Sequence, residues 1–397
     1  MTDLLVRVYR VRFGDAILVS IPDEEGGRAV KRHILFDFGN ALSKEGGDDV
    51  VFKPIVDDLL SVLDGQALDL YVMTHEHLDH VQGLFYAAEK LNTRIPVKQA
   101  WLTGSADPRY YKTHKDAAQR KLAALAVLRT ITPRLMADSR RSPFADVLLA
   151  NNDTDTTRKC VDFLRTKLTS PDRVKYVDRE TDLRTLQPAR SATISLWAPE
   201  ENTADYYGQF KRLARSLGID DDADFDSFGA ATAAGDVDPA SPPRPPAGVD
   251  AGAFYNLLEV RHSNEASTLL SIDKASNNTS IVMLIEWKGW RLLFTGDAEK
   301  RSWKMMDKVG VIKAIHFLKV SHHGSHTGMP ETEILEKLMP LPSPDGRPRQ
   351  SAVSTYPGTY DSVPDEPTLT ELRRRSELRS TADLGPGDLW IDFHFAP

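Results

Sequence analysis

The sequence predicts an α/β fold, and three observations lead to this prediction. Hydrophobic residues make up 41% of the 397 residues, as in globular proteins. Strand-like and helix-like segments alternate over the first hundred residues, and strand-like segments return after residue 280. Polar motifs follow several of the strand-like segments, as they do where the loops of a rigid scaffold carry a functional site.

The N-terminal hundred residues are expected to form strands and helices in alternation. Runs of branched apolar residues are typical of strands, whereas apolar residues at helical spacing are typical of helices. The predicted helices cover 54–63, which ends near Gly65, and 81–91. The predicted strands are 4–9, 16–21, 33–36, 68–73 and 97–102.

The middle of the chain differs in character from both ends. Residues 105–190 are predicted to form a helical insertion, with interruptions at Pro133 and Pro143. Residues 219–252 are acidic and rich in alanine and proline, which predicts a flexible loop. We therefore expect one domain, 1–397, that carries the insertion and the loop.

Strand-like segments resume in the C-terminal part. Strands are predicted at 280–286 and 291–294, with Gly289 in a hairpin turn between them. The remaining predicted elements are a strand at 315–320, a helix at 368–378 and a closing strand at 389–395.

Composition narrows the class of protein. Cys160 is the only cysteine, which excludes an intrachain disulfide and a cysteine-based zinc site and favours a reducing cytoplasm. The formal net charge of −7 argues against a globally basic nucleic-acid-binding protein but leaves room for a local basic groove. No segment is long and apolar enough for a membrane span, and residues 1–3 open no signal peptide, so we expect no membrane insertion.

The densest group of metal-ligand side chains lies at 74–80, where T-H-E-H-L-D-H follows a predicted strand. Imidazole and carboxylate are ligands that zinc and related divalent metals prefer. His75 and His77 are two positions apart, so on an extended segment they point to the same side and can hold one ion. Asp79 and His80 point elsewhere and can hold a second ion. The alternative interpretation is a polar loop with solvated histidines.

Three further motifs occur in order along the chain. They are F-D-F-G at 36–39, F-T-G-D at 294–297 and V-S-H-H-G-S at 320–325, and each ends a strand-like run. Together with T-H-E-H-L-D-H they resemble the motifs of the metallo-β-lactamase fold. The hydrolases and nucleases of that fold bind one or two metals between two β-sheets.

Within this superfamily the chain is most similar to the soluble domain of ComEC-type DNA-uptake proteins. G-D-A-I-L at 14–18, N-x-x-S at 277–280 and a late segment at 354–364 carry this similarity, together with H-H-G-S. The membrane channel of the full ComEC-type proteins has no counterpart in this chain. The matching parts are roughly 4–104, 190–200 and 275–397.

The resemblance implies an αββα sandwich, in which two mixed β-sheets lie face to face with helices outside and metals at one edge. It also implies one or two zinc ions, with manganese as an alternative. Asp297 would bridge the two ions, and Asp37 would accept an imidazole N–H and so orient a ligand. The H-G pattern favours His323 over His322 as the last ligand. The implied metal ligands are His75, His77, Asp79, His80, Asp297 and His323.

The chain departs from the family pattern at two places. Many members have a histidine where residues 276–280 read S-N-N-T-S, although ComEC-type members share the asparagine. His262 and His114 are the nearest alternatives, and neither lies in a motif, so the first metal would have one protein ligand fewer. Residues 360–364 also lack the histidine of the family's Y-G-H-P stretch.

The implied reaction is hydrolysis by a water that a metal pair activates. Asn277 and Ser325 would contact the substrate's oxygens, and His322 would lie close enough to join them. His326 is a second candidate for substrate contact or proton transfer, although it also fits an ordinary loop histidine. The residues expected to act directly in catalysis are Asp79, Asp297, His322 and His326.

Two basic segments are candidates for contact with a nucleic-acid backbone. Lys112 and Lys115 lie in 109–115, where cations and aromatic residues mix, as suits phosphate contact and base stacking. The alternative for this segment is a solvated helix start. Residues 373–375 are three arginines on a predicted helix, which also fits a solvated face.

The sequence therefore predicts a metal-dependent hydrolase, most similar to phosphodiesterases and nucleases that act on nucleic acid. One alternative is a hydrolase of the same fold that cleaves a lactone, a thioester or a small phosphoester. Others are an effector of a bacterial defence system and a non-catalytic interaction subunit. A basic groove would favour nucleic acid, and a narrow apolar pocket would favour a small substrate.

Overall fold

The computed structural model describes residues 2–42, 48–137, 148–152, 154–207, 269–356 and 363–397. The chain divides into two compact units. The larger, here called the sandwich unit, comprises Met1–Pro108, Ala150–Glu201 and Ser276–Pro397. The smaller, here called the helical unit, comprises Arg109–Leu149 and Asn202–Ala275. The predicted flexible loop at 219–252 lies outside the described residues.

The first sheet of the sandwich unit is mixed and has seven strands in the order β13-β1-β2-β3-β4-β5-β6. Strands β13, β1, β2 and β3 pair in antiparallel fashion, and β3 to β6 pair in parallel. The bounds are β1 (Leu4–Tyr9), β2 (Ile17–Glu25), β3 (Arg28–Phe36), β4 (Leu70–Met73), β5 (Ala100–Thr103), β6 (Val174–Val177) and β13 (Trp390–Phe395).

The second sheet is also mixed and has six strands in the order β12-β11-β10-β9-β8-β7. It repeats the plan of the first, since β7, β8 and β9 are antiparallel and β9 to β12 are parallel. Lys288 and Gly289 both have positive φ in the two-residue turn between β8 and β9, where the sequence predicts a hairpin. The bounds are β7 (Ala192–Ala198), β8 (Val282–Trp287), β9 (Trp290–Phe294), β10 (Phe317–Lys319), β11 (Gln350–Val353) and β12 (Glu377–Ser380).

The two sheets pack face to face through one apolar core, to which alternate residues of each strand contribute. Phe36 of the first sheet stacks on Phe294 of the second, with ring centroids 4.4 Å apart. Burial of such side chains is the main favourable term in folding. This core explains why Leu4, Val6 and Val8 of β1 are all buried while the intervening residues are half-buried.

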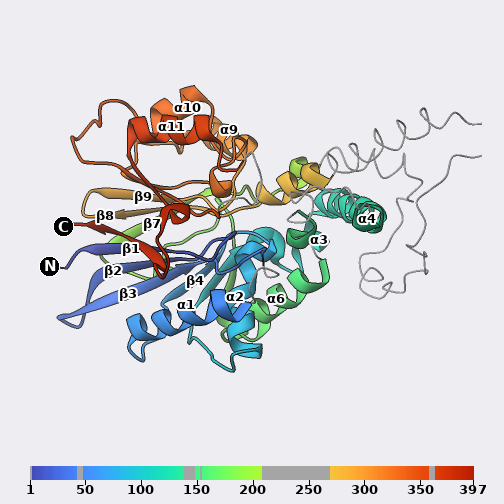
Figure 1. Ribbon diagram of the computed structural model, residues 1–397, viewed down its shortest axis with the longest axis horizontal. Helices are drawn as coiled ribbons and strands as arrows, with labels where there is room; N and C mark the ends of the chain where they lie inside the picture. The colour runs from blue at the N-terminus through green and yellow to red at the C-terminus, as the bar shows by residue number, and fades with distance from the viewer. Residues whose placement is uncertain (1, 43–47, 138–147, 153, 208–268, 357–362) are drawn as a thin grey trace, which may run out of the picture. The chain divides into compact units, whose positions relative to one another are not determined.

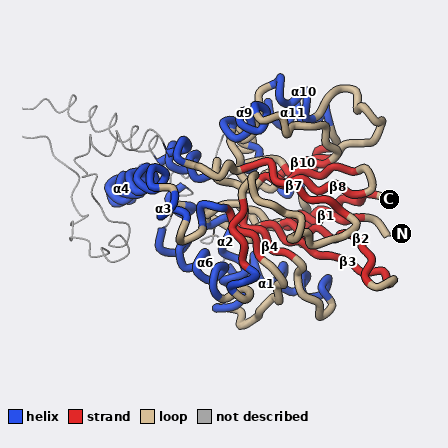
Figure 2. The backbone as a smooth tube through the Cα atoms, turned by 180° about the vertical axis from the view of Figure 1, so that it is seen from behind, coloured by secondary structure: helices blue, strands red, loops and turns tan. Residues whose placement is uncertain are grey.

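Helices cover the outer face of each sheet (Figures 1 and 2). One apolar cluster lies between the first sheet and the helices α1 (Asp48–Leu63), α2 (Leu78–Glu89) and α6 (Thr154–Thr166). Another lies between the second sheet and α9 (Lys300–Lys308), α10 (Thr332–Leu338) and α11 (Glu366–Arg375). The expectation of an α/β protein with two mixed sheets and helices outside them is confirmed.

The expected helical insertion at 105–190 differs from the structure in its extent. The helical unit holds α3 (Tyr110–Thr113), α4 (Lys115–Ala137) and the apolar residues that pack on them. Helix α6 and strand β6 fall inside 105–190 but belong to the sandwich unit, where β6 pairs with β5. Likewise, the predicted helix at 368–378 ends at Arg375, and its last residues begin β12.

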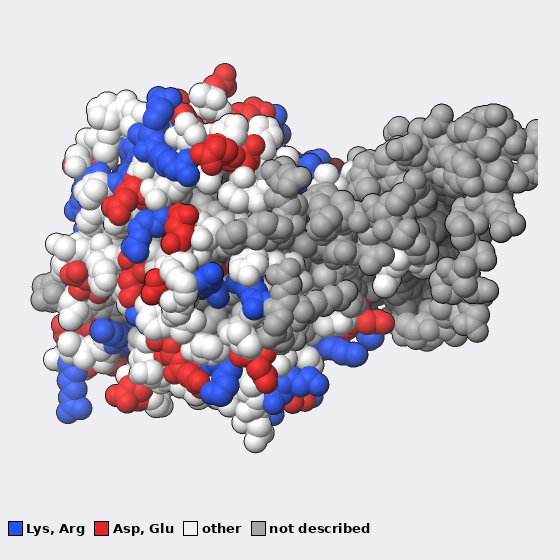
Figure 3. Space-filling view, viewed as in Figure 1, with Lys and Arg blue, Asp and Glu red and all other residues white. Residues whose placement is uncertain are grey.

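Two surface properties bear on the expected partners. No helix in the described parts of the chain is long and apolar enough to cross a membrane. On the face shown in Figure 3, positive and negative side chains of the described residues are interspersed. Ion pairs on the surface of the sandwich unit include Lys313 with Glu286 and Lys337 with Asp307.

Candidate metal centre

The motif residues lie at the ends of strands in both sheets of the sandwich unit. Asp37 directly follows β3, His75 lies two residues after β4, and Asp297 lies three residues after β9. His322 and His323 follow β10 by three and four residues. β3 runs parallel to β4, and β9 runs parallel to β10, so the carboxyl ends of each pair lie at one edge of its sheet. Residues far apart in sequence therefore meet there.

Four side chains form a compact buried group, here called the Asp-His cluster: Asp79, His80, Asp297 and His323. Each offers one ligand atom, and these atoms all lie within 4.8 Å of one another. The Nε2 atom of His323 is 3.1 Å from Asp79 Oδ2, and Nε2 of His80 is 3.4 Å from Asp297 Oδ2. All four side chains are at most 2% exposed. The cluster draws two members from the first turn of α2 and two from loops of the second sheet.

The donor set of this cluster fits a divalent metal ion. Asp79 Oδ1, Asp297 Oδ1 and His80 Nε2 are buried and make no hydrogen bond to any part of the chain that the structure describes. Burying such atoms without a partner is unfavourable. A cation in contact with them would remove this cost, and two imidazoles with two carboxylates are typical ligands of zinc or manganese.

Neighbouring groups set the orientation of both histidine rings in the cluster. Nδ1 of His80 donates to Asp37 Oδ2 over 2.8 Å, and Asp37 also accepts hydrogen bonds from the Thr74 amide and hydroxyl. Nδ1 of His323 donates to the Ser354 carbonyl over 2.9 Å. In each ring the opposite nitrogen, Nε2, is thereby directed at the carboxylates, as is usual for metal-ligating histidines. Asp37 thus stands where the sequence expectation puts it.

The carboxylates of the cluster and the imidazole of His80 stabilise each other's charged forms. Burial alone would raise the pKa of Asp79 and of Asp297, but interactions with His80 and His323 outweigh it and hold both pKa values below the usual one. Burial likewise lowers the pKa of His80, but Asp297, Asp79 and Asp37 outweigh this and raise it well above its usual value. Without a metal, His80 therefore carries the positive charge that these carboxylates require.

His75 and His77 form a pair beside the cluster. Their Nε2 and Nδ1 atoms are 3.1 Å apart, and the His75 ring lies 4.2 Å from that of His80. Burial, together with the charges of His80 and His77, lowers the pKa of His75 well below its usual value, so His75 is neutral. Among the described residues, the pair belongs to no tight group of three or more ligand side chains. The expected first metal position therefore consists of two adjacent imidazoles.

The adjacent His322 and His323 point to different neighbours. Both have positive φ, 47° and 52°, which is uncommon for residues with a side chain. His323 joins the cluster, whereas Nδ1 of His322 lies 2.9 Å from Glu299 Oε1 and its Nε2 lies 3.4 Å from Asn277 Nδ2. Glu299 is buried and is absent from the sequence prediction. Its position two residues after Asp297 is the only signal that could have identified it.

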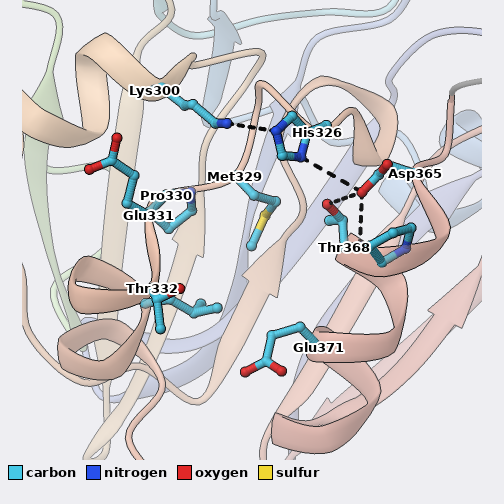
Figure 4. Close-up of a pocket in the computed structure, with 11 residues that line it drawn as sticks. Lys300, His326, Met329, Pro330, Glu331, Thr332, Asp365, Thr368 and Glu371 are labelled. Carbon is cyan, nitrogen blue, oxygen red and sulfur yellow. Dashed lines mark hydrogen bonds and ion pairs between the residues drawn. The ribbon is translucent and has the colours of Figure 1, made fainter.

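Two further predicted site residues lie in the loop after His323. His326 is 69% exposed, and its Nε2 lies 2.9 Å from Lys300 Nζ. It lines an open cavity of about 350 Å³ with Met329, Asp365 and Thr368 (Figure 4) and is not a member of the buried cluster. The Ser325 hydroxyl is 3.2 Å from that of Thr327. The structure gives neither residue a contact with the cluster.

The basic residues predicted to contact nucleic acid differ in their surroundings. Lys112 and Lys115 are exposed residues of the helical unit, whereas the cluster belongs to the sandwich unit. Arg373 and Arg374 pair with glutamates of their own helix. The prediction for Arg375 is wrong, because its side chain is 1% exposed and binds Glu371, Glu336 and the Met339 carbonyl.

The chain was also compared with known proteins. No protein-family model matches it, and no curated protein matches it at a significant level.

Proposed function

We propose that this chain is a metal-dependent hydrolase of the metallo-β-lactamase type. The observation that carries the proposal is the Asp-His cluster, whose ligand atoms converge from both sheets. Three of its buried atoms, Asp79 Oδ1, His80 Nε2 and Asp297 Oδ1, make no hydrogen bond among the described residues. The order of the motifs and the two mixed sheets between helices agree with the resemblance seen in the sequence.

In this proposal Asp79, His80, Asp297 and His323 hold one divalent ion, zinc or manganese, and His75 with His77 offers ligands for a second. A bound ion of this kind supplies Lewis acidity that turns water into a nucleophile near neutral pH. Asp37 keeps a proton on Nδ1 of His80, which leaves the lone pair of Nε2 for the ion. The Ser354 carbonyl does the same for His323.

His322 is the residue that we assign to proton transfer. Its Nδ1 faces the Glu299 carboxylate, which stabilises a proton on that nitrogen and thus the charged ring. The Asn277 amide lies beside both groups, 3.4 Å from His322 Nε2 and 3.5 Å from Glu299 Oε1, and it can hold a substrate oxygen there. A positioned proton donor of this kind contributes roughly 10²–10⁴-fold to a rate.

We propose a phosphodiester as the substrate, with nucleic acid preferred. The support is the resemblance to the ComEC-type branch, together with the chemistry of phosphoryl transfer, which requires charge stabilisation on both attacking and leaving oxygens. The interspersed charges on the face of Figure 3 supply no broad basic surface. Lys112 and Lys115 remain the proposed candidates for contact with a nucleic-acid backbone.

The test combines metal analysis with a substrate panel. Protein purified without chelator is analysed for bound metal and then assayed on labelled DNA and RNA, a small chromogenic diester, lactones and thioesters. We expect bound zinc or manganese and cleavage of phosphodiesters. Activity on long substrates should fall steeply with salt if lysines contact phosphates. Protein that binds no divalent metal would contradict the proposal. Salt-insensitive activity confined to lactones or thioesters would show that the substrate is one of these compounds and not a phosphodiester.

A further inference from the structure

Beside the Asp-His cluster lies a buried ion pair that joins the two sheets. Lys319, the last residue of β10, places Nζ 2.8 Å from Oδ2 of Asp15, which lies in the loop between β1 and β2. Both side chains are 1% exposed. The same ammonium group donates a hydrogen bond to the Val320 carbonyl over 3.0 Å. The pair is therefore removed from solvent.

The loop that carries Asp15 contacts two members of the cluster. The Asp15 amide donates to the Asp79 carbonyl over 3.0 Å. Asp15 Oδ1 lies 4.0 Å from Nδ1 of His323, and the ring of Phe13 packs 4.3 Å from the His323 ring. The loop thus touches one ligand from the first sheet and one from the second.

The packing of this loop leaves no room for adjustment. A Cβ atom on Gly14 would lie 2.7 Å from the Asp79 carbonyl oxygen, which is closer than real Cβ contacts. A Cβ on Gly39 would lie 2.2 Å from the Asp79 carbonyl carbon. The backbone of Asp79 is therefore fixed by the position of the loop, and the loop is anchored to the second sheet through Lys319.

Stability alone gives no reason for such a pair. Removing two charges from water is costly, and replacing a buried ion pair by uncharged side chains of similar size is often neutral or stabilising. Asp15 also belongs to a second group of possible metal ligands, with Asp37 and His80. An uncompensated Asp15 carboxylate would compete with the cluster for a cation, whereas the ammonium group of Lys319 offsets its charge.

We propose that Asp15 and Lys319 are a positioning pair for the metal centre. The ammonium group keeps the Asp15 carboxylate out of metal coordination, and the anchored loop holds Asp79 and His323 at the spacing that a metal requires. This inference rests on the proposed function in that the cluster must bind metal. It assigns the pair no direct contact with the metal or the substrate.

The test separates metal affinity from folding. The double variant Asp15→Asn/Lys319→Met removes both charges at nearly constant volume, and Glu286→Gln/Lys313→Met does the same for the exposed ion pair of the same unit. Zinc affinity is measured by competition with a chromogenic chelator, the cobalt absorption spectrum reports ligand geometry, and Tm is measured in chelator. We expect the first double variant to keep or raise the metal-free Tm, to bind zinc at least tenfold more weakly and to show an altered cobalt spectrum. The control variant should match wild type in affinity and spectrum.

The single variant Lys319→Met and two further outcomes complete the test. Lys319→Met alone leaves a buried carboxylate unpaired, so its metal-free Tm should lie below that of the double variant. Wild-type protein that binds no metal would overturn the proposed function and the positioning role together. If wild type binds metal and the folded double variant binds it equally well with the same spectrum, the positioning role alone is wrong.

Discussion

At the scale of single residues, the adjacent His322 and His323 can be tested separately, because we assign them different roles. His323→Ala removes a cluster ligand and should abolish most metal binding, because the remaining three side chains hold the ion less tightly. His322→Ala leaves the cluster intact, so metal content should stay at the wild-type level while turnover falls by roughly 10²–10⁴-fold. Elemental analysis and a steady-state assay on both variants check this. Equal metal loss in the two variants would contradict the separate roles.

Asp297 tests the electrostatics of the same cluster. Asp297→Ala should abolish hydrolysis and reduce metal binding, since one of two cluster carboxylates is lost. In metal-free protein the substitution removes the interactions with His80 and His323 that lower the pKa of Asp297, so Tm in chelator at neutral pH should fall. Thermal unfolding in chelator, beside the exposed control Asp3→Ala, measures this. An unchanged Tm in Asp297→Ala would show that the charges of the cluster do not stabilise the metal-free fold.

The ligand types of the site could be predicted from sequence, but their contacts across the sheets could not. His75, His77, Asp79 and His80 lie within six positions, so local spacing alone brings them together. Asp15 lies in G-D-A-I-L and Glu299 lies two residues after Asp297, but the sequence does not show that they contact Lys319 and His322. His326 lies near the same motif but is exposed and outside the cluster, so its role in substrate contact or proton transfer stays a prediction.

At the scale of elements, Asp23 ties a strand of the first sheet to the start of β7. Its carboxylate accepts hydrogen bonds from the Arg190 and Ser191 amides, each over 2.9 Å. Burial would raise the pKa of Asp23, but these amides and the neighbouring Arg32 outweigh it and hold the pKa below its usual value of 3.8. The ionised form therefore stabilises the fold above about pH 3.8, and this stabilisation is lost as the pH falls through the lowered pKa.

Asp23→Asn should accordingly destabilise the protein by about 2 kcal/mol near neutral pH, the typical contribution of hydrogen bonds to a charged group. The difference in Tm between wild type and variant should stay constant from pH 7 to pH 5. It should shrink below about pH 4, where wild-type Asp23 becomes protonated. Thermal unfolding at a series of pH values checks the trend, and a difference that grows on acidification would contradict it.

Among the elements, hydrophobic patterning predicts most of the apolar strands but not β6, β7, β11 or β12. β1 and β13 lie within one residue of the predicted segments. β12 reads Glu377-Leu378-Arg379-Ser380, which carries no strand pattern, and the predicted helix at 368–378 includes its first two residues. Its pairing with β11 determines its structure. Tertiary contacts override local preference at such positions.

At the scale of the whole sandwich unit, the C-terminal strand completes the core between the sheets. β13 pairs with β1, at the other end of the chain, and the Phe393 ring packs 5.1 Å from the ring of Phe317 in the second sheet. Phe393→Ala should cost about 3–5 kcal/mol of unfolding free energy, as large buried aromatics usually do. Chemical denaturation measures the loss. Phe393→Leu should lose less than half as much, and equal losses would argue against a packing effect.

Because the cluster ligands come from both sheets, a bound metal would affect how easily the two sheets separate. Asp79 and His80 come from the first sheet's side of the sandwich, and Asp297 and His323 come from the second. An ion held by all four would act as a removable cross-link between the two sheets at one edge of the sandwich unit. Its free energy of binding would add directly to the free energy that resists their separation. Amide hydrogen exchange at that edge should therefore accelerate on chelation, while the opposite edge, at the β8–β9 hairpin, exchanges at an unchanged rate.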